Sequence, residues 1–358
     1  MLLRRNKKWI ILIGVAVLIK IFSFFPFAVE KYYSTGIYPL IAKLLRILFG
    51  WIPFSVGDIF YVALGIFLIV RLVSFLKKLF GRRINRAYAL YVMQVVLQWC
   101  LWIYIIFNLA WGLNYDRVGN DYQAQQKLAP YDKNELHELV QLLVDRLNAL
   151  DSSAHVIRDD LHQKKYLFSN AFVCYNNASS QHNYLLYRAE SVKPSVFSYM
   201  GNYLGFSGYY NPFSGEAQVN TTVPVYVQPF TTCHEIGHQL GYARENEANF
   251  AGFLSARAST NPAFRYSVYF DLYLYAASEL YGRDSTLLVP LREKLNPSVR
   301  NDLRNLREFF KKYQNPFEPY IRRIYGRYLR ANNQPKGIMT YDEVTGRILA
   351  YYKKHGEI

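Results

Sequence analysis

Residues 232–241 of the chain read Thr-Cys-His-Glu-Ile-Gly-His-Gln-Leu-Gly, and residues 244–250 read Arg-Glu-Asn-Glu-Ala-Asn-Phe. Side chains four residues apart project from one face of a helix, so His234 and His238 can bind a single metal ion together. Glu235 then lies beside that metal, in the place of a general base for a water molecule. The spacing therefore predicts a metal site with hydrolytic chemistry.

The residues around the histidines predict two packed helices. Alternating valines in 223–227 and then Pro229 indicate a short strand and a turn before the first helix. Gly241 is the type of residue that ends a helix in a left-handed conformation. An apolar-periodic run from Glu245 to Ala258 indicates a second helix that folds back on the first. This context favours a zinc peptidase over the alternative, a surface helix whose histidines and glutamate are only solvated.

Two glutamates at the start of the second helix compete for the role of third metal ligand. The positions three, four and seven residues after Glu245 carry small side chains and Asn249, which gives a face able to approach the histidine helix. The same offsets from Glu247 give a larger, core-like apolar face. The spacing favours Glu245, with Glu247 as the alternative; Asn249 is expected to hold a metal-bound histidine, and Arg244 to pair with one of the glutamates. Three protein ligands leave one position open for water, as in catalytic zinc sites.

The two motifs together resemble a known arrangement of zinc peptidases. His-Glu-Ile-Gly-His followed by Glu-Asn-Glu-Ala-Asn-Phe-Ala is similar to the gluzincin pattern, in which a later Glu-x-x-x-Asp/Asn supplies the third ligand and its support. This resemblance implies one Zn²⁺ on His234, His238 and Glu245, with Glu235 as the base. It places Asn249 where many relatives have aspartate.

A second resemblance covers nearly the whole chain. The motifs, the apolar N-terminal segments and the stretch Gly-Tyr-Tyr-Asn-Pro-Phe-Ser-Gly-Glu-Ala-Gln-Val-Asn at 208–220 resemble an uncharacterised bacterial membrane family, domain of unknown function 3810. This family implies a membrane location and brings no established substrate.

The first 113 residues are predicted to form a membrane domain. Residues 9–29, 58–76 and 87–111 are apolar runs long enough to cross a bilayer, and the third has Trp and Tyr near its ends. Residues 37–54 are apolar with basic residues on one side, which predicts an interfacial or re-entrant helix, with a fourth short span as the alternative.

The basic residues predict how the chain is oriented. Four precede the first span and five lie in the loop 77–86, so the positive-inside rule puts both segments in the cytoplasm. Residues 1–86 hold fourteen basic and two acidic side chains, which leaves a net charge of only +4 on the rest out of +16 in total. Membrane topology explains the basic excess, and nucleic-acid binding is not expected. The sequence predicts a multi-pass protein of the bacterial inner (cytoplasmic) membrane.

Residues 114–358 are expected to form an extracytoplasmic, zincin-like domain that is mainly α (α+β) with a small sheet. Asp132 and Glu135 form a capping-box pattern at the start of an amphipathic helix. Residues 165–230 are dense in Gly, Tyr, Asn and Pro, which suggests a small sheet with long loops. Helical patterns return after the motifs, at 264–281, 287–295, 298–313, 316–329 and 341–354.

Weaker candidates lie outside the motifs. Tyr210, like its neighbour Tyr209, is a candidate to stabilise an oxyanion, with packing as the simpler alternative. Residues 216–220 are either an edge strand that receives an extended peptide or an ordinary strand. Cys174 and Cys233 would both face an oxidising compartment and could pair.

These observations predict a membrane-anchored zinc metallopeptidase. Its substrate would be a peptide or protein outside the cytoplasm, its other partner the lipid bilayer, and no oligomeric state is indicated. A zinc-binding scaffold without peptidase activity is one alternative, which a closed site with four ligands, including both Glu245 and Glu247 or a cysteine, would favour. A zinc amidase acting on a cell-wall or lipid-linked amide is another, which a groove too narrow for an extended chain, or the lack of an edge strand beside the motif helix, would favour.

Overall fold

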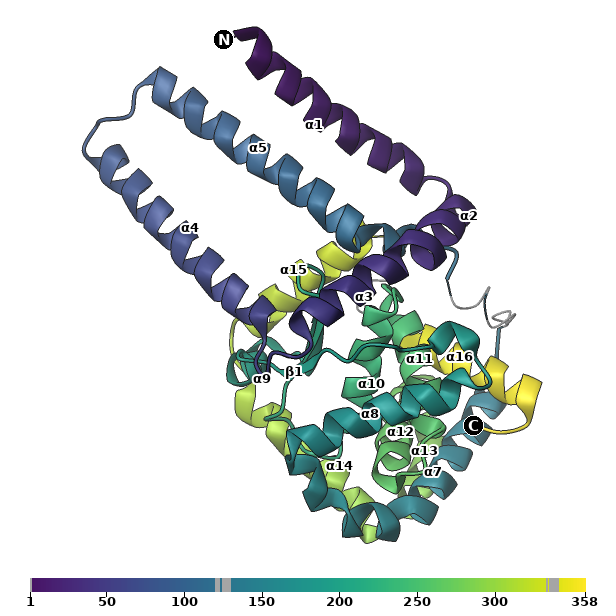
Figure 1. Cartoon of the computed structure of the whole chain (residues 1–358). Coiled ribbons are helices and arrows are strands. Elements are labelled where there is room, and N and C mark those ends of the chain that lie inside the picture. The colour runs from purple at the N-terminus through teal and green to yellow at the C-terminus, as the bar shows by residue number, and fades with distance from the viewer. Residues whose placement is uncertain (1, 120–122, 124–129, 333, 335–340) are drawn as a thin grey trace.

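A computed structural model of the chain describes residues 2–119, 123, 130–332, 334 and 341–358. The described chain is mostly helical, with one small sheet (Figure 1). Its α-helices are α1 (Leu2–Ser23), α2 (Pro26–Ala28), α3 (Tyr38–Phe49), α4 (Val56–Phe80), α5 (Arg86–Ala110), α7 (Lys133–Val156), α8 (Lys164–Ser179), α9 (Ser198–Leu204), α10 (Gln228–Gln239), α11 (Glu245–Arg257), α12 (Pro262–Arg283), α13 (Ser285–Glu293), α14 (Pro297–Tyr313), α15 (Glu318–Ala331) and α16 (Tyr341–His355). Shorter π- and 3-10-helical segments are η1 (Val29–Ile37), η2 (Gly112–Asp116), η3 (Arg158–His162) and η4 (Asn183–Leu185), and the strands are β1 (Val192–Pro194), β2 (Gly208–Asn211) and β3 (Glu216–Val219).

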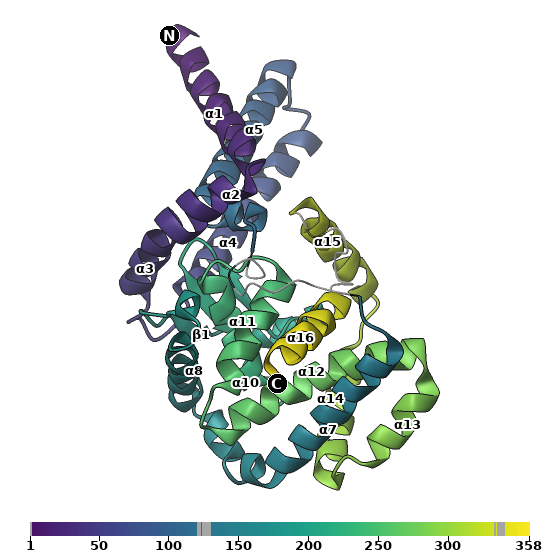
Figure 2. The ribbon, with the colours of Figure 1, turned by 90° about the vertical axis from the view of Figure 1, so that its right-hand side faces the viewer.

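Helices α4 and α5 are each long and apolar enough to cross a membrane, and they include almost all of the predicted spans 58–76 and 87–111. They extend away from the other helices, and α1 packs against α5 (Figures 1 and 2). The predicted span 9–29 is wrong at its end, because α1 stops at Ser23 and the chain bends by 98° before the next helices. Pro26 lacks a backbone N–H and begins a new helix instead of continuing the first. The bent segment makes a third candidate span only if both of its arms are counted together.

Helix α3 occupies most of the segment predicted to be interfacial or re-entrant. One of its faces, with Tyr38, Ala42 and Arg46, is buried, and the helix packs on β3. The opposite face exposes apolar side chains such as Leu40 and Leu44. Arg46 points into the protein and not into solvent. The buried face of the helix therefore contains a charged residue, whereas the exposed face is apolar.

The small sheet has the strand order β1-β3-β2. Strand β3 pairs parallel with β1 and antiparallel with β2, with Tyr209 opposite Gln218 in the second pair. The alternative in which residues 216–220 form an edge strand is therefore wrong, since β3 is the central strand and β2 lies at an edge. Parallel strands are joined by a crossover connection, so no local sequence pattern could have shown that β1 pairs with β3.

Most of the other predicted helices are present, with two corrections. The capping box at Asp132 starts α7, which packs extensively on α12. The stretch 165–230 contains the small sheet but begins with helix α8, whose buried residues repeat at helical spacing among Asn and Ser. The strand predicted at 223–227 is a series of turns, because Pro224 cannot donate to a ladder and its carbonyl accepts a turn hydrogen bond from Val227.

The two cysteines that could pair lie together in the core without a disulfide. Cys174 on α8 and Cys233 on α10 are free and fully buried. Burial and the neighbouring Cys174 thiol raise the pKa of Cys233 well above its ordinary value. Both thiols therefore act as small core side chains behind the histidine helix.

Candidate metal centre

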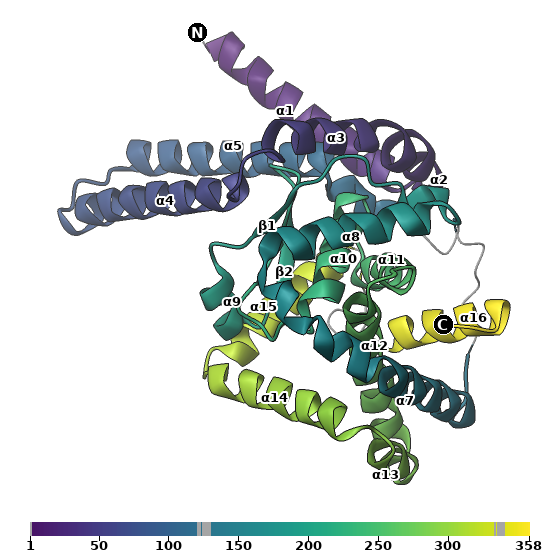
Figure 3. The same cartoon turned by 60° about the horizontal axis from the view of Figure 1, so that its bottom comes forward.

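The two helices that carry the motifs pack unusually closely. A Cβ atom on Gly237 would stand 3.1 Å from the carbonyl oxygen of Ala248, and one on Gly252 would stand 3.1 Å from the backbone nitrogen of His234. Glycine at both positions therefore lets α10 and α11 approach each other. Gly241 has a φ of +88°, which confirms the predicted left-handed end of the first helix. Figure 3 shows α10 beside α11, and α10 also contacts β2 and β3.

Both motif histidines are oriented by hydrogen bonds at Nδ1. The Nδ1 atom of His234 lies 2.8 Å from Asn249 Oδ1, and that of His238 lies 2.7 Å from the carbonyl oxygen of Tyr242. Each acceptor favours the tautomer with the proton on Nδ1, which leaves the Nε2 lone pair free to bind a metal. Asn249 therefore holds a motif histidine in the way its spacing predicted.

Glu245, and not Glu247, lies at the histidines. Its Oε2 atom is 3.3 Å from His234 Nε2 and 3.9 Å from His238 Nε2. Glu247 is buried and accepts from Arg244 Nη1 at 3.2 Å, so the predicted pairing of Arg244 with one of the glutamates is present. The two open alternatives are thus separated in space: one carboxylate faces the imidazoles and the other faces a guanidinium.

Glu235 lies next to this group with an unsatisfied oxygen. Candidate ligand atoms of His234, Glu235 and His238 all lie within 4.8 Å of one another. Glu235 Oε2 is buried and has no hydrogen-bond partner among the described residues. A Cβ atom on Gly208 would stand 2.5 Å from Glu235 Oε1, so the backbone of edge strand β2 passes directly beside this carboxylate.

Burial and mutual charge shift the protonation of the four groups in different directions. Burial alone would lower the pKa of His234, but contact with Glu245 and the charge of Glu235 raise it to about 9. Burial and the neighbouring His234 lower the pKa of His238 to about 4. Burial would raise the pKa of Glu245, but its contacts with both histidines outweigh this effect and lower it to about 2. Burial raises the pKa of Glu235 to about 8.

Tyr210 lies on β2, and the ring of Trp111 contacts both its ring and that of His238. Its ring is 5.2 Å from that of Trp111, which is in turn 6.0 Å from the ring of His238. Its hydroxyl is 3.4 Å from the hydroxyl of Tyr38. The neighbouring Tyr209 turns elsewhere, and its hydroxyl donates to Asp58 at the start of α4.

Segments next to the candidate spans hold the end of the histidine helix. Trp111 Nε1 donates to the carbonyl of His238 at 3.2 Å, and Tyr38 and Arg46 donate to the carbonyl of Gln239 at 2.9 and 3.1 Å. The last carbonyls of a helix have no partner within the helix, so these donors satisfy them. No local sequence pattern indicates this set, since its members lie more than 100 residues before the motif.

Tyr325 is a further residue at the site that the sequence does not predict. Its hydroxyl donates to Glu245 Oε1 at 2.8 Å, opposite to the oxygen that faces the histidines. It belongs to α15, eighty residues after Glu245, in a helix that carries several tyrosines. No local signal distinguishes it from the other tyrosines of that helix.

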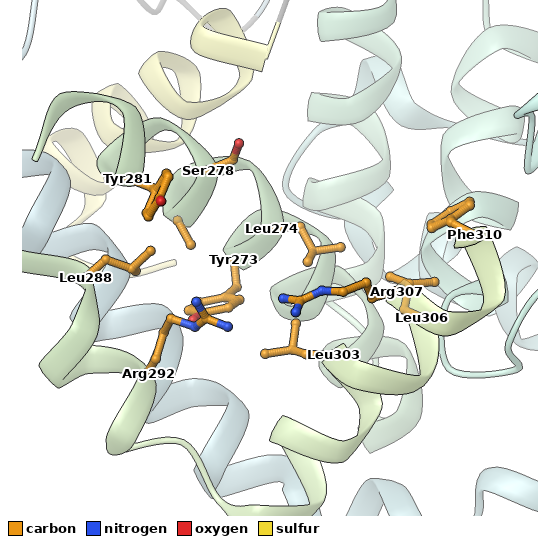
Figure 4. Close-up of a pocket in the computed structure, with 11 residues that line it drawn as sticks. Tyr273, Leu274, Ser278, Tyr281, Leu288, Arg292, Leu303, Leu306, Arg307 and Phe310 are labelled. Carbon is orange, nitrogen blue, oxygen red and sulfur yellow. The ribbon is translucent and has the colours of Figure 1, made fainter. Parts of the chain in front are cut away.

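A separate groove lies between α12, α13 and α14 (Figure 4). It has a volume of about 410 Å³, and its walls are mainly Leu and Tyr side chains, with Arg292 and Arg307 among the lining residues. None of the predicted site residues lines it, so the groove is distinct from the histidine centre.

Comparison with known proteins places the chain in a family. No curated protein and no solved structure matches it. A family model matches residues 33–349, which include α4, α5, the sheet and both motif helices. The chain therefore belongs to the family described as "Protein of unknown function (DUF3810)".

Proposed function

We propose that the chain is a membrane-anchored zinc metallopeptidase of gluzincin-like, zincin-like design that hydrolyses peptide bonds outside the cytoplasm. The observation that carries this proposal is the convergence of three donor atoms: His234 Nε2, His238 Nε2 and Glu245 Oε2. Glu235 supports it with a buried oxygen that has no partner among the described residues. The location outside the cytoplasm rests on the basic residues around the first two spans.

The donor set fits zinc. Two imidazoles and one carboxylate are the protein ligands of several catalytic zinc sites, and both imidazoles are fixed through Nδ1 in the orientation that such ligands need. Zinc held by His234, His238 and Glu245 would supply Lewis acidity, lowering the pKa of a water molecule and polarising a carbonyl group. Tyr325 would keep the Glu245 carboxylate in place through its second oxygen.

Glu235 is the residue that would move the proton. Its position beside the ligand atoms suits it to take a proton from the attacking water and to give that proton to the leaving amine. Burial raises its pKa toward neutrality, which is the range where one carboxyl group can serve both as base and as acid. Edge strand β2 would align an extended peptide next to this carboxylate by strand addition.

Two features favour this proposal over its alternatives. A structural zinc site would need a fourth protein ligand, but Glu247 faces Arg244 and not the histidines. An amidase for a compact group would need no edge strand beside the base, yet β2 passes along Glu235. Both observations favour a site with three protein ligands beside an edge strand.

The first test is the metal content of the purified full-length protein. We expect one zinc per chain in the wild type, loss of zinc in Glu245→Ala, and retention of zinc in Glu247→Ala, because only Glu245 faces the imidazoles. Inductively coupled plasma mass spectrometry of the three proteins measures this directly. Wild-type protein without bound metal after growth in zinc would contradict the proposal, and zinc-dependent cleavage of a quenched-fluorescent peptide library would support it.

Zinc binding should depend on pH through His234. Its pKa of about 9 in the metal-free protein means that a proton must leave before zinc binds at neutral pH. The zinc affinity should therefore fall by about tenfold for each pH unit below 9, and rise as the pH increases toward 9. Titration calorimetry of the wild-type protein at pH 7 in buffers of different ionisation enthalpy counts the protons released when zinc binds. Zinc binding at pH 7 without proton release would contradict the expectation.

Gly208→Ala should reduce hydrolysis without removing zinc. The added methyl group would displace the Glu235 carboxylate, which lies 2.5 Å from the position of the new Cβ atom, while the ligand atoms lie elsewhere. We expect a lower kcat with unchanged zinc content. Gly282→Ala on α12 is the control for any general effect of losing glycine, because its backbone is helical and a Cβ atom there meets nothing within 4 Å. Equal activities of the two variants would rule out the role of β2.

A further inference from the structure

Helix α15 exposes a stripe of large apolar side chains. Phe317, just before the helix, is 70% exposed, Tyr320 is 62% exposed and Ile324 is 67% exposed. With Tyr328, these residues recur every three or four positions and therefore share one face of the helix. Most of the remaining surface of the helix is basic, with Arg322, Arg323, Arg327 and Arg330. An aromatic stripe next to arginines is the composition of a helix that lies in a membrane interface.

This stripe faces the ends of the candidate spans. The hydroxyl of Tyr328 is 3.2 Å from that of Tyr115, which belongs to η2 directly after α5. Because Phe317, Tyr320 and Ile324 share the face of Tyr328, they are turned toward the same side. Figure 1 shows α15 crossing below the ends of α4 and α5, and Figure 2 places it beside them at the same level.

Helix α9 continues the exposed surface. Asp58, in the first turn of α4, accepts a hydrogen bond from the backbone N–H of Val196 at 2.7 Å. This bond connects the residues just before α9 to the start of α4. Val196, Tyr199 and Met200 are exposed there, and α9 packs against α15. The apolar surface of α9 and α15 is therefore joined to the apolar surface of the spans.

We propose that the exposed faces of α15 and α9 lie on the surface of an anionic phospholipid bilayer, and that the histidine centre acts on polypeptides anchored in that bilayer. The spans bring the bilayer to this side of the molecule, the aromatic side chains suit its interface, and the four arginines of α15 match the phosphate groups. Tyr325 connects the two regions, since it belongs to the same helix and donates to Glu245. The statement about substrates rests on the proposed function; the contact with lipid does not.

The contact is tested in full-length protein reconstituted into nanodiscs of phosphatidylglycerol and phosphatidylcholine. In a Cys100→Ala background, Ile324→Cys carries an environment-sensitive fluorophore, because Cys174 and Cys233 are buried. Val289→Cys is the matched control: Val289 is an exposed aliphatic residue on α13, which lies away from the spans (Figure 2). We expect spin-labelled lipids to quench the label at 324 several-fold more strongly than the label at 289. Equal quenching at both positions would overturn the proposal, whether or not the protein hydrolyses peptides.

The substrate class is tested with one quenched-fluorescent peptide in two forms, coupled to a lipid in vesicles or free in solution. The anchored form should be cleaved faster than the free form, and Ile324→Glu should reduce this preference while its zinc content stays normal. Equal rates for both forms would overturn the substrate assignment. Strong quenching at 324 together with no cleavage of either form would instead contradict the proposed peptidase function and leave the lipid contact standing.

Discussion

Glu235→Gln is expected to abolish peptide hydrolysis while the protein keeps its zinc. The amide retains the size of the carboxylate but cannot accept a proton from water, so the general base and acid are lost together. Loss of such a group lowers the rate by about 100- to 10,000-fold. Zinc should remain bound because the converging donor atoms belong to His234, His238 and Glu245.

The matched variant for this prediction is His238→Ala. It should lose both zinc and hydrolysis, since it removes one of the two imidazoles whose Nε2 atoms face Glu245. Zinc content and cleavage rate measured on both variants separate the base from the ligand. If Glu235→Gln lost as much zinc as His238→Ala, the assigned roles would be wrong.

Glu30→Ala is expected to destabilise the protein strongly. Glu30 in η1 accepts from Arg117 Nη2 at 2.7 Å and from Arg117 Nε at 2.9 Å, and both side chains are buried. Arg117 also donates to the carbonyl of Gly241, where the histidine helix ends. Removing one member of a buried ion pair leaves the other charge unpaired in the interior, which costs about 3–5 kcal/mol of unfolding free energy.

Thermal unfolding of the detergent-solubilised protein measures this effect. Lys133→Ala is the control, because Lys133 pairs with Asp284 at 3.2 Å on the surface, where an ion pair contributes little. The double variant Glu30→Ala/Arg117→Met should regain part of the lost stability, as it leaves no buried charge unpaired. A Glu30→Ala protein as stable as Lys133→Ala would show that η1 does not anchor the turn after the histidine helix.

Features that repeat within one or two helical turns were predictable from the sequence. The histidine pair, the left-handed Gly241 and the capping box at Asp132 each depend on residues a few positions apart. The apolar runs of α4 and α5 were equally clear, because a helix that crosses a bilayer must be apolar along its whole length. Local spacing also limited the candidates for the third metal ligand to Glu245 and Glu247.

Features that depend on distant partners could not be predicted. The central place of β3 follows from its pairing with β1, and the role of Tyr325 follows from the way α15 folds back over Glu245. Helix α8 was missed because its core positions are separated by Asn and Ser, which are poor helix formers, although tertiary packing stabilises the helix.

The sequence by itself determined that His234 and His238 share one face, because the helical repeat brings them together wherever the helix lies. Only the tertiary structure showed which of the two glutamates lies at the histidines, since it turns Glu245 to the imidazoles and Glu247 to Arg244. It also decided that segments next to the spans hold the end of the histidine helix. The physical reason is that backbone spacing sets which residues share a face, whereas packing between distant segments sets what that face meets.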